Sequence, residues 1–202
     1  MIDCAEYSKE FPLSDEIIYL NHAAVSPWPR KTTDAIIKFT DENLVYGASN
    51  YPEWIKTETS LRKQIQLLIN APSSDDIALL KNTSEALSVV AYGLSWSEGD
   101  EIIIPDQEFP SNRIVWESLI DKGVNVITVN ITDAEVPENA IIDAITSSTR
   151  LISVSSVQYT SGLRLNLEPI GVACKSNNIL FCVDAIQSLG VFEMDVQKIH
   201  AD

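Results

Sequence analysis

Short apolar runs and longer amphipathic stretches alternate along most of the chain after residue 76. The apolar runs predict strands at residues 77–80, 101–105, 124–129, 151–155 and 179–183. The stretches between them predict helices at residues 84–94, 110–120, 139–145 and 168–175. Strands that alternate with helices are typical of a parallel sheet, because each parallel connection has to cross over the sheet. The pattern therefore predicts an α/β fold, with a mainly parallel sheet and helices on both faces.

The first third of the chain has a different pattern. Residues 19–29 read as a short strand that enters a loop, because two prolines and a serine interrupt regular pairing. Pro29 is suited to open a helix, and the apolar residues that follow it have helical spacing. A second helix is expected from about Pro52 to residue 69, where Asn70 and Pro72 end it.

Composition limits the kinds of partner. The 202 residues can bury one sizeable core, and a net charge of −15 disfavours binding to nucleic acid or to an anionic membrane. The three cysteines, Cys4, Cys174 and Cys182, have no CxxC spacing, which favours a reducing compartment over a disulfide framework. The N-terminus lacks the basic and apolar regions of a signal peptide, and no apolar run could span a bilayer. We therefore expect a cytoplasmic protein.

The most informative stretch is residues 181–187, where an apolar strand runs into Asp184 and Gln187 follows three residues later. Ligands of parallel α/β sheets bind beyond the carboxyl ends of the strands. A carboxylate buried there without a partner would cost stability and have a raised pKa. A positively charged ring nitrogen would compensate for that cost. The alternative for Asp184 is an N-cap of the next turn, and Gln187 could equally be a solvated side chain.

Three further loops carry candidate groups. Thr83 and Ser84 stand where a helix begins, so they could hold an anion such as a phosphate, or they could simply cap the helix. Phe109 could stack on a planar ring or pack in the core below the next helix. Residues 155–162 are polar and aromatic where a simple turn would suffice, which is a weaker indication of a site.

Five segments together carry a family resemblance. In chain order they are residues 19–24, 82–87, 108–112, 160–162 and 183–190. Their sequences and their order resemble the class V aminotransferases, enzymes of fold type I that use pyridoxal 5′-phosphate (PLP). This group includes cysteine desulfurases, selenocysteine lyases and isopenicillin N epimerase-like proteins.

The resemblance implies a role for each matching residue. Thr83 and Ser84 would bind the PLP phosphate, Phe109 would stack on the ring, Asp184 would pair with the ring nitrogen and Gln187 would contact the phenolic oxygen. Asn21, His22 and Ala23 would lie near the substrate. Phe109 stands where many relatives have histidine, and Ser156 stands where desulfurases usually have an asparagine that touches the phenolic oxygen. Both differences weaken an assignment as a desulfurase in particular. The resemblance also implies a homodimer.

In this family the lysine that forms the Schiff base follows an acidic residue that resembles Asp202. The resemblance therefore implies a large PLP-binding domain of fold type I that is truncated before the catalytic lysine. Residues 1–28 would form an arm and a substrate-side loop, residues 29–202 an incomplete large domain, and the small C-terminal domain would be absent. On this basis we expect no catalytic residue in the chain and weak or absent binding of PLP.

Two functions stay open. The chain is either part of a PLP-dependent enzyme that acts on an amino acid by transamination, desulfuration, epimerisation or elimination, or a natural short paralogue with a non-catalytic binding or interaction role. An unrelated α/β enzyme is disfavoured, because the sequence contains no GxGxxG and no GxxxxGK[ST] motif. Its two histidines, His22 and His200, are isolated in the sequence, so no metal site is expected.

Overall fold

The protein is described by a computed structural model that covers residues 7–202. The chain divides into two compact units, residues up to Ser60 and residues Leu61–Asp202. The predicted arm, residues 1–28, falls within the first unit.

The first unit contains helix α2 (Arg30–Tyr46) and the first part of helix α3 (Tyr51–Ile69). The two helices begin beside Pro29 and Pro52 as the sequence predicted. Trp54 joins them, because its ring packs edge-on against Phe39 at 5.0 Å and its indole N–H donates to Glu42 at 2.8 Å. The prediction of a strand near residue 19 is wrong, since no described segment pairs with these residues.

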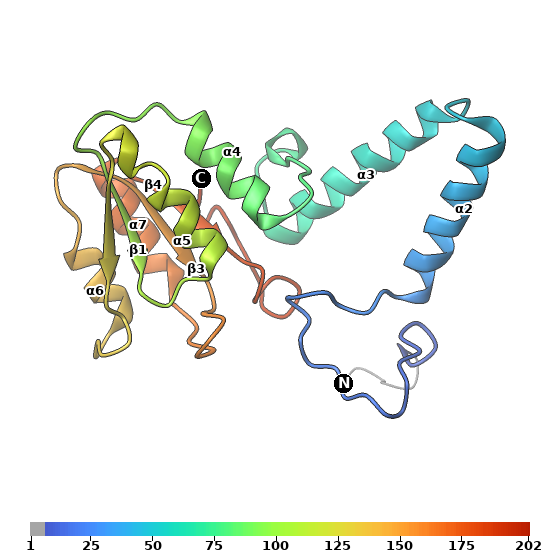
Figure 1. Ribbon diagram of the computed structural model, residues 1–202, viewed down its shortest axis with the longest axis horizontal. Coiled ribbons are helices and arrows are strands. Elements are labelled where there is room, and N and C mark those ends of the chain that lie inside the picture. Colours follow the sequence, from blue (N-terminus) through green and yellow to red (C-terminus); the bar gives the residue numbers. More distant parts are fainter. Residues whose placement is uncertain (1–6) are drawn as a thin grey trace. The chain divides into compact units, whose positions relative to one another are not determined.

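The second unit is built on a four-stranded sheet in the order β2-β1-β3-β4, and all of its strand pairs are parallel (Figure 1). The strands are β1 (Glu101–Pro105), β2 (Asn125–Val129), β3 (Thr149–Ser155) and β4 (Leu180–Asp184). Pro105 lies opposite Val129 in the register, and Ser155 lies opposite Asp184. The carboxyl ends of the strands therefore share one edge of the sheet, where a ligand of this architecture binds.

Helices cover both faces of this sheet. They are α4 (Thr83–Gly93), α5 (Pro110–Glu117), α6 (Pro137–Asp143) and α7 (Leu167–Asn177), with short 3₁₀ helices at Ser74–Asp76 and Ile120–Lys122. Ile103 and Phe181 belong to a core cluster that includes residues of α6 and α7, whereas Ile102 and Leu151 belong to one with residues of α4 and α5. Because side chains of a strand alternate between the faces, these two clusters are the two sides of the sheet, and the predicted fold is confirmed.

Two elements of the second unit differ from the sequence prediction. Residues 77–80 form no strand, and Leu79 and Leu80 are 37% and 43% exposed. A short apolar run becomes a strand only where another strand can pair with it, and no described segment does so here. The helix predicted over residues 110–120 ends earlier, at Glu117, and a separate 3₁₀ helix follows it. Within residues 7–202, no helix combines the length and the apolar character that a membrane span requires.

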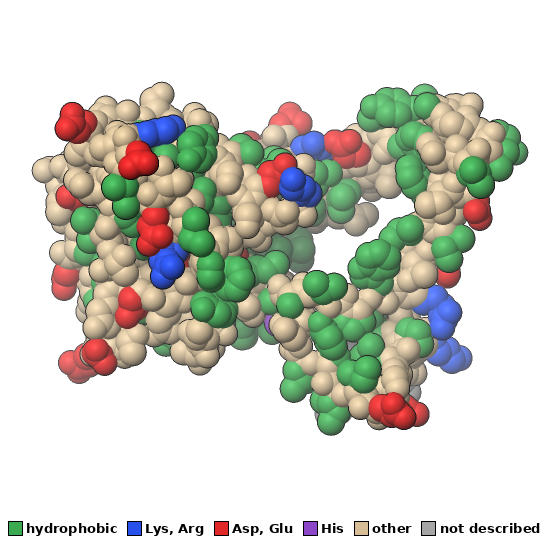
Figure 2. Space-filling view, in the orientation of Figure 1, with side chains coloured by type: hydrophobic (Ala, Val, Ile, Leu, Met, Phe, Trp, Pro, Cys, Tyr) green, Lys and Arg blue, Asp and Glu red, His purple; other side chains and the backbone are tan. Residues whose placement is uncertain are grey.

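Acidic side chains are spread over the visible surface and do not gather in one patch (Figure 2). Exposed apolar side chains lie among them on α2, where no residue is buried.

Candidate functional site

Asp184 is the last residue of β4, and its side chain is buried at the carboxyl edge of the sheet. Burial raises the pKa of its carboxyl group, and a hydrogen bond from the Ile186 N–H to Oδ1, at 2.9 Å, partly opposes that rise. Among residues 7–202 no cationic side chain forms an ion pair with Asp184. The edge of the sheet thus holds a carboxylate whose charge no described side chain compensates.

Ser156 connects the end of β3 to the turn after β4. Its N–H donates to the Asp184 carbonyl oxygen at 2.9 Å, and its hydroxyl shares a 2.7 Å hydrogen bond with the Ser188 hydroxyl. The Ser188 N–H closes the turn by donating to the Ala185 carbonyl oxygen at 3.0 Å. Gln187 lies in this turn and is half-buried. Ser156, Asp184 and Gln187 therefore lie at one edge of the sheet, at or just beyond the ends of β3 and β4.

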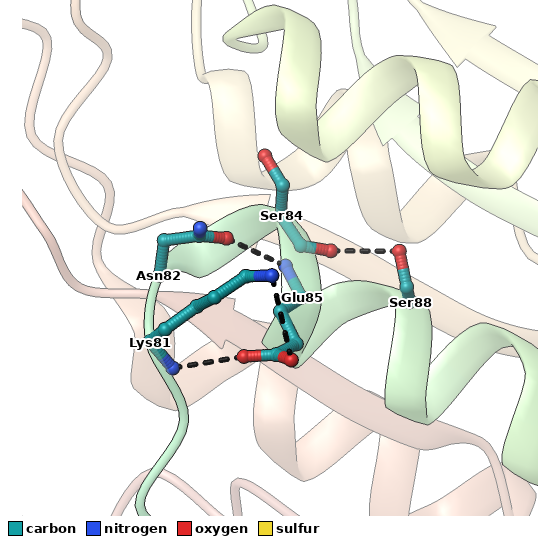
Figure 3. Close-up of polar contacts among 5 residues, drawn as sticks. All are labelled: Lys81, Asn82, Ser84, Glu85 and Ser88. Carbon is teal, nitrogen blue, oxygen red and sulfur yellow. Dashed lines mark hydrogen bonds and ion pairs between the residues drawn. The ribbon is translucent and has the colours of Figure 1, made fainter.

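The N-terminus of α4 is capped by Asn82, whose Oδ1 accepts from the Glu85 N–H at 2.9 Å (Figure 3). The Glu85 carboxylate in turn accepts from the Lys81 N–H at 2.9 Å. Capping by Thr83 or Ser84, the alternative considered from the sequence, is therefore wrong. The Ser84 side chain points away from this cluster in Figure 3. Within the described chain, the N–H groups of Thr83 and Ser84 have no acceptor, so both are available to an anion.

Phe109 sits immediately before α5 and is 46% exposed, so it is not a core residue. Its ring packs edge-on against Tyr159, with 5.0 Å between the ring centroids. Ser84 and Phe109 line the same cavity, of about 490 Å³, together with Tyr92 and Ile114. The structure therefore places Ser84 and Phe109 around one hollow, whose lining does not include Thr83.

The sequence prediction missed the side chain that connects these loops. Glu108 is buried and accepts hydrogen bonds from Ser155, Gln158 and Asn112. Asn112 accepts from Trp116 at 3.0 Å. The spacing of Glu108, Asn112 and Trp116, four residues apart each time, is the signal in the sequence that could have shown an inward-facing polar row.

The residues predicted to lie near the substrate belong to the first unit. Asn21 and His22 are exposed, Ala23 is half-buried, and the His22 carbonyl oxygen accepts from the Ser26 hydroxyl at 3.1 Å. Their role stays a prediction from the resemblance.

The described cysteines are poor nucleophiles. Burial raises the pKa of the Cys174 thiol to about 12, with a further contribution from the Asp202 charge. Burial also raises the pKa of the Cys182 thiol, to about 11. Both thiols stay protonated at neutral pH, and the thiolate is the reactive form. Cys4 lies outside the described residues.

The sequence model of one protein family, described as aminotransferase class-V, matches residues 18–202. The chain belongs to this family. A probable cysteine desulfurase of Methanothermobacter thermautotrophicus is 34% identical over 199 residues, which cover 96% of this chain and 50% of the relative. A probable cysteine desulfurase of Pyrococcus abyssi is 32% identical and is likewise covered over 50% of its length. This class-V aminotransferase chain therefore spans about half the length of these relatives.

Solved structures agree with this assignment. The apo cysteine desulfurase of Thermococcus onnurineus superposes with a TM-score of 0.81 at 27% identity, over 100% of this chain and 52% of that one. A mutant of the protein C-DES, with glycine covalently linked to its PLP cofactor, has a TM-score of 0.88 at 20% identity, over 96% of this chain and 53% of that one. The second likeness concerns the fold alone. The family resemblance inferred from the sequence is confirmed.

Proposed function

We propose that this chain carries the PLP-binding part of a class-V enzyme that acts on an amino acid. The observation that carries the proposal is Asp184, a buried carboxylate at the ligand-binding edge of the sheet without a cationic partner in the described chain. The membership of the family, and relatives named as probable cysteine desulfurases, support it.

The residues present fit the cofactor at its ring nitrogen. A protonated pyridine nitrogen would supply the positive charge that Asp184 lacks, and Asp184 would hold the proton on that nitrogen. Burial is the main cause that raises the pKa of the Cys182 thiol, and the negative charges of Asp184 and Glu108 add to it, so two carboxylates act on the same region. This excess of negative charge favours a cationic ligand group over an anionic one at this end of the site.

The other end of the site suits the phosphate. The unpaired N–H groups of Thr83 and Ser84 and the positive end of the α4 dipole would bind it. Phe109 would cover the ring, while Ser156 and Gln187 would face the phenolic oxygen. When bound, PLP supplies an electron sink for the α-carbon of an amino acid. The described side chains would bind and orient the ring, and Asp184 would keep its nitrogen protonated.

The finer points of the proposal rest on the resemblance. Asn21, His22 and Ala23 would contact the amino-acid substrate, and the protein would be a cytoplasmic homodimer. The exposed apolar side chains of α2 support the dimer, because a second copy of the chain could cover them. Light scattering that finds only monomers at high concentration would count against the dimer.

Calorimetry with pyridoxine 5′-phosphate tests the cofactor site. This ligand has the ring and the phosphate of PLP but no aldehyde, so it cannot form an imine with a surface lysine. We expect weak, saturable binding with one site, and an affinity lower by roughly tenfold to a hundredfold in Asp184→Asn, because a hydrogen bond to a charged group is lost.

The half-buried carboxylate Asp195 provides the control, and Asp195→Asn should bind like the unchanged protein. Equal affinities of Asp184→Asn and the unchanged protein, or no binding by either, would overturn the proposal.

A further inference from the structure

Glu108 is a buried carboxylate, 5% exposed, that no ion pair accounts for in the described part of the chain. Protein donors occupy both of its oxygens instead. Oε1 accepts from the Ser155 N–H at 2.6 Å and from Gln158 Nε2 at 3.1 Å, and Oε2 accepts from the Ser155 hydroxyl at 2.5 Å and from Asn112 Nδ2 at 2.8 Å. A group so enclosed cannot reach a substrate, so its role is structural or positional.

The partners of Glu108 are sequence neighbours of candidate site residues. Ser155 directly precedes Ser156, and Gln158 directly precedes Tyr159, whose ring packs against Phe109. Phe109 itself directly follows Glu108. One carboxylate therefore fixes the two loops that carry Phe109 and Ser156. Because the Ser156 N–H donates to the Asp184 carbonyl oxygen, the same set of contacts extends to β4.

One buried acceptor in this network has no hydrogen-bond partner among residues 7–202, which lowers the stability of the fold. Gln158 is 1% exposed, and its Oε1 has no hydrogen-bond partner in the described chain, although a buried acceptor without a partner is destabilising. The two Gln158 contacts that do exist run from Nε2, to Glu108 and to the Ser155 carbonyl oxygen. Turning the amide around would bring Oε1 against the Glu108 carboxylate. Glu108 thus imposes the orientation of Gln158 at the expense of stability.

We propose that Glu108 is the positioning residue of the cofactor site, holding Phe109 and Ser156 in place for the ring. This role rests on the proposed binding of PLP. The positioning role requires a carboxylate at residue 108. A glutamine there would replace one oxygen by an NH₂ group, and this group would face two of the four hydrogen-bond donors. On Oε1 the backbone N–H of Ser155 cannot become an acceptor, and on Oε2 Asn112 could accept only by turning its amide, which would take Oδ1 away from Trp116 and Ser153.

Glu108→Gln is therefore the informative variant, and Glu101→Gln is its matched control. Glu101 lies at the other end of β1, where its carboxylate accepts from the Thr146 hydroxyl at 2.5 Å. Both variants lose a hydrogen-bonded carboxylate, Glu101 at the start of β1 and Glu108 in the loop between β1 and α5. Amide NMR shifts of Ser156, Tyr159 and Ile186 report the loop geometry without ligand, and calorimetry with pyridoxine 5′-phosphate reports the affinity.

We expect Glu108→Gln to shift these three amides and to weaken binding roughly tenfold, which corresponds to one hydrogen bond of ordinary strength. Adding Glu108→Gln to Phe109→Ala should cost much less affinity than it costs alone, since the ring to be positioned is gone. Glu101→Gln should lower stability and change neither readout. If Glu108→Gln does not fold, Ser155→Ala, which removes one donor, should shift the same amides by a smaller amount.

If Glu108→Gln changes neither the three amide NMR shifts nor the affinity for pyridoxine 5′-phosphate, Glu108 only stabilises the fold. Fully additive losses with Phe109→Ala would equally overturn the positioning role. If the unchanged protein binds no pyridoxine 5′-phosphate, the proposed function fails, and the amide shifts alone then decide whether Glu108 sets the geometry of the loops.

Discussion

At the scale of single residues, the candidate site retains two buried carboxylates that the fold itself does not neutralise. Asp184 has one backbone donor on its side chain and a pKa raised by burial. Glu108, in contrast, has four donors. The difference indicates that Glu108 serves the structure of the site, whereas Asp184 is left for a ligand.

Asp184→Asn should make the protein without ligand more stable at neutral pH. The folded-state pKa of Asp184 lies above its ordinary value of 3.8, so the folded state holds the proton to higher pH than the unfolded state does. Stability therefore falls as the pH rises from 3.8 through the folded-state pKa, and the asparagine avoids this loss. Urea unfolding at pH 7 should show the gain, and the gain should shrink as the pH is lowered toward about 4.

Asp195 provides the opposite case. Hydrogen bonds from the Lys198 N–H and from Asn70 lower the pKa of its carboxyl group. Its contribution to stability is present above the ordinary pKa and disappears as the pH falls through the lowered value. Asp195→Asn should thus destabilise the protein at pH 7, and a stabilising effect there, or a destabilising effect of Asp184→Asn, would contradict this assignment.

At the scale of elements, α7 is held unusually close to the last turn of the chain. A Cβ atom on Gly171 would lie 1.7 Å from the Ile199 carbonyl oxygen, which is backbone and cannot swing aside. The turn is anchored on both sides, since the Val196 N–H donates to the Ile69 carbonyl oxygen at 3.0 Å and the Asp202 N–H donates to the Phe181 carbonyl oxygen at 3.1 Å. Glycine is therefore required in α7 for packing.

Gly171→Ala should destabilise the protein by about 1–3 kcal/mol, the range for an overpacked site. Gly93→Ala in α4 is the matched control, because a Cβ atom there would meet nothing within 4 Å. That change should be neutral or stabilise the protein by about 0.5–1 kcal/mol through a better helix propensity. Thermal unfolding measures the stability of both variants. A loss of stability in Gly171→Ala well below its expected range would show that the last turn can move away from α7.

The same scale shows what the sequence can predict. The strand that ends at Asp184 was predicted from its apolar run and its place in the alternation of strands and helices, and in the structure it pairs with β3. Residues 77–80 are equally apolar but have no pairing strand in the described chain, and periodicity alone cannot reveal that. Phe109 and Ser84 were assigned from their loops, whereas Glu108 was missed because most of its hydrogen bonds come from Ser155 and Gln158, more than 40 residues away in sequence.

At the scale of the whole molecule, the described chain consists of two compact units and spans about half the length of its relatives. The second unit contains all of the proposed cofactor contacts, from Thr83 to Gln187, and the first contains the predicted substrate-side residues. Binding of the cofactor is therefore the part of the proposed function that measurements on the second unit's residues can test.

A crystal structure of the protein with pyridoxine 5′-phosphate tests the central claim most directly. We predict that the ring nitrogen lies beside the Asp184 carboxylate, that Phe109 covers the ring, and that the phosphate accepts from the N–H groups of Thr83 and Ser84. A ligand bound at another place, or bound here with its ring nitrogen away from Asp184, would contradict the account.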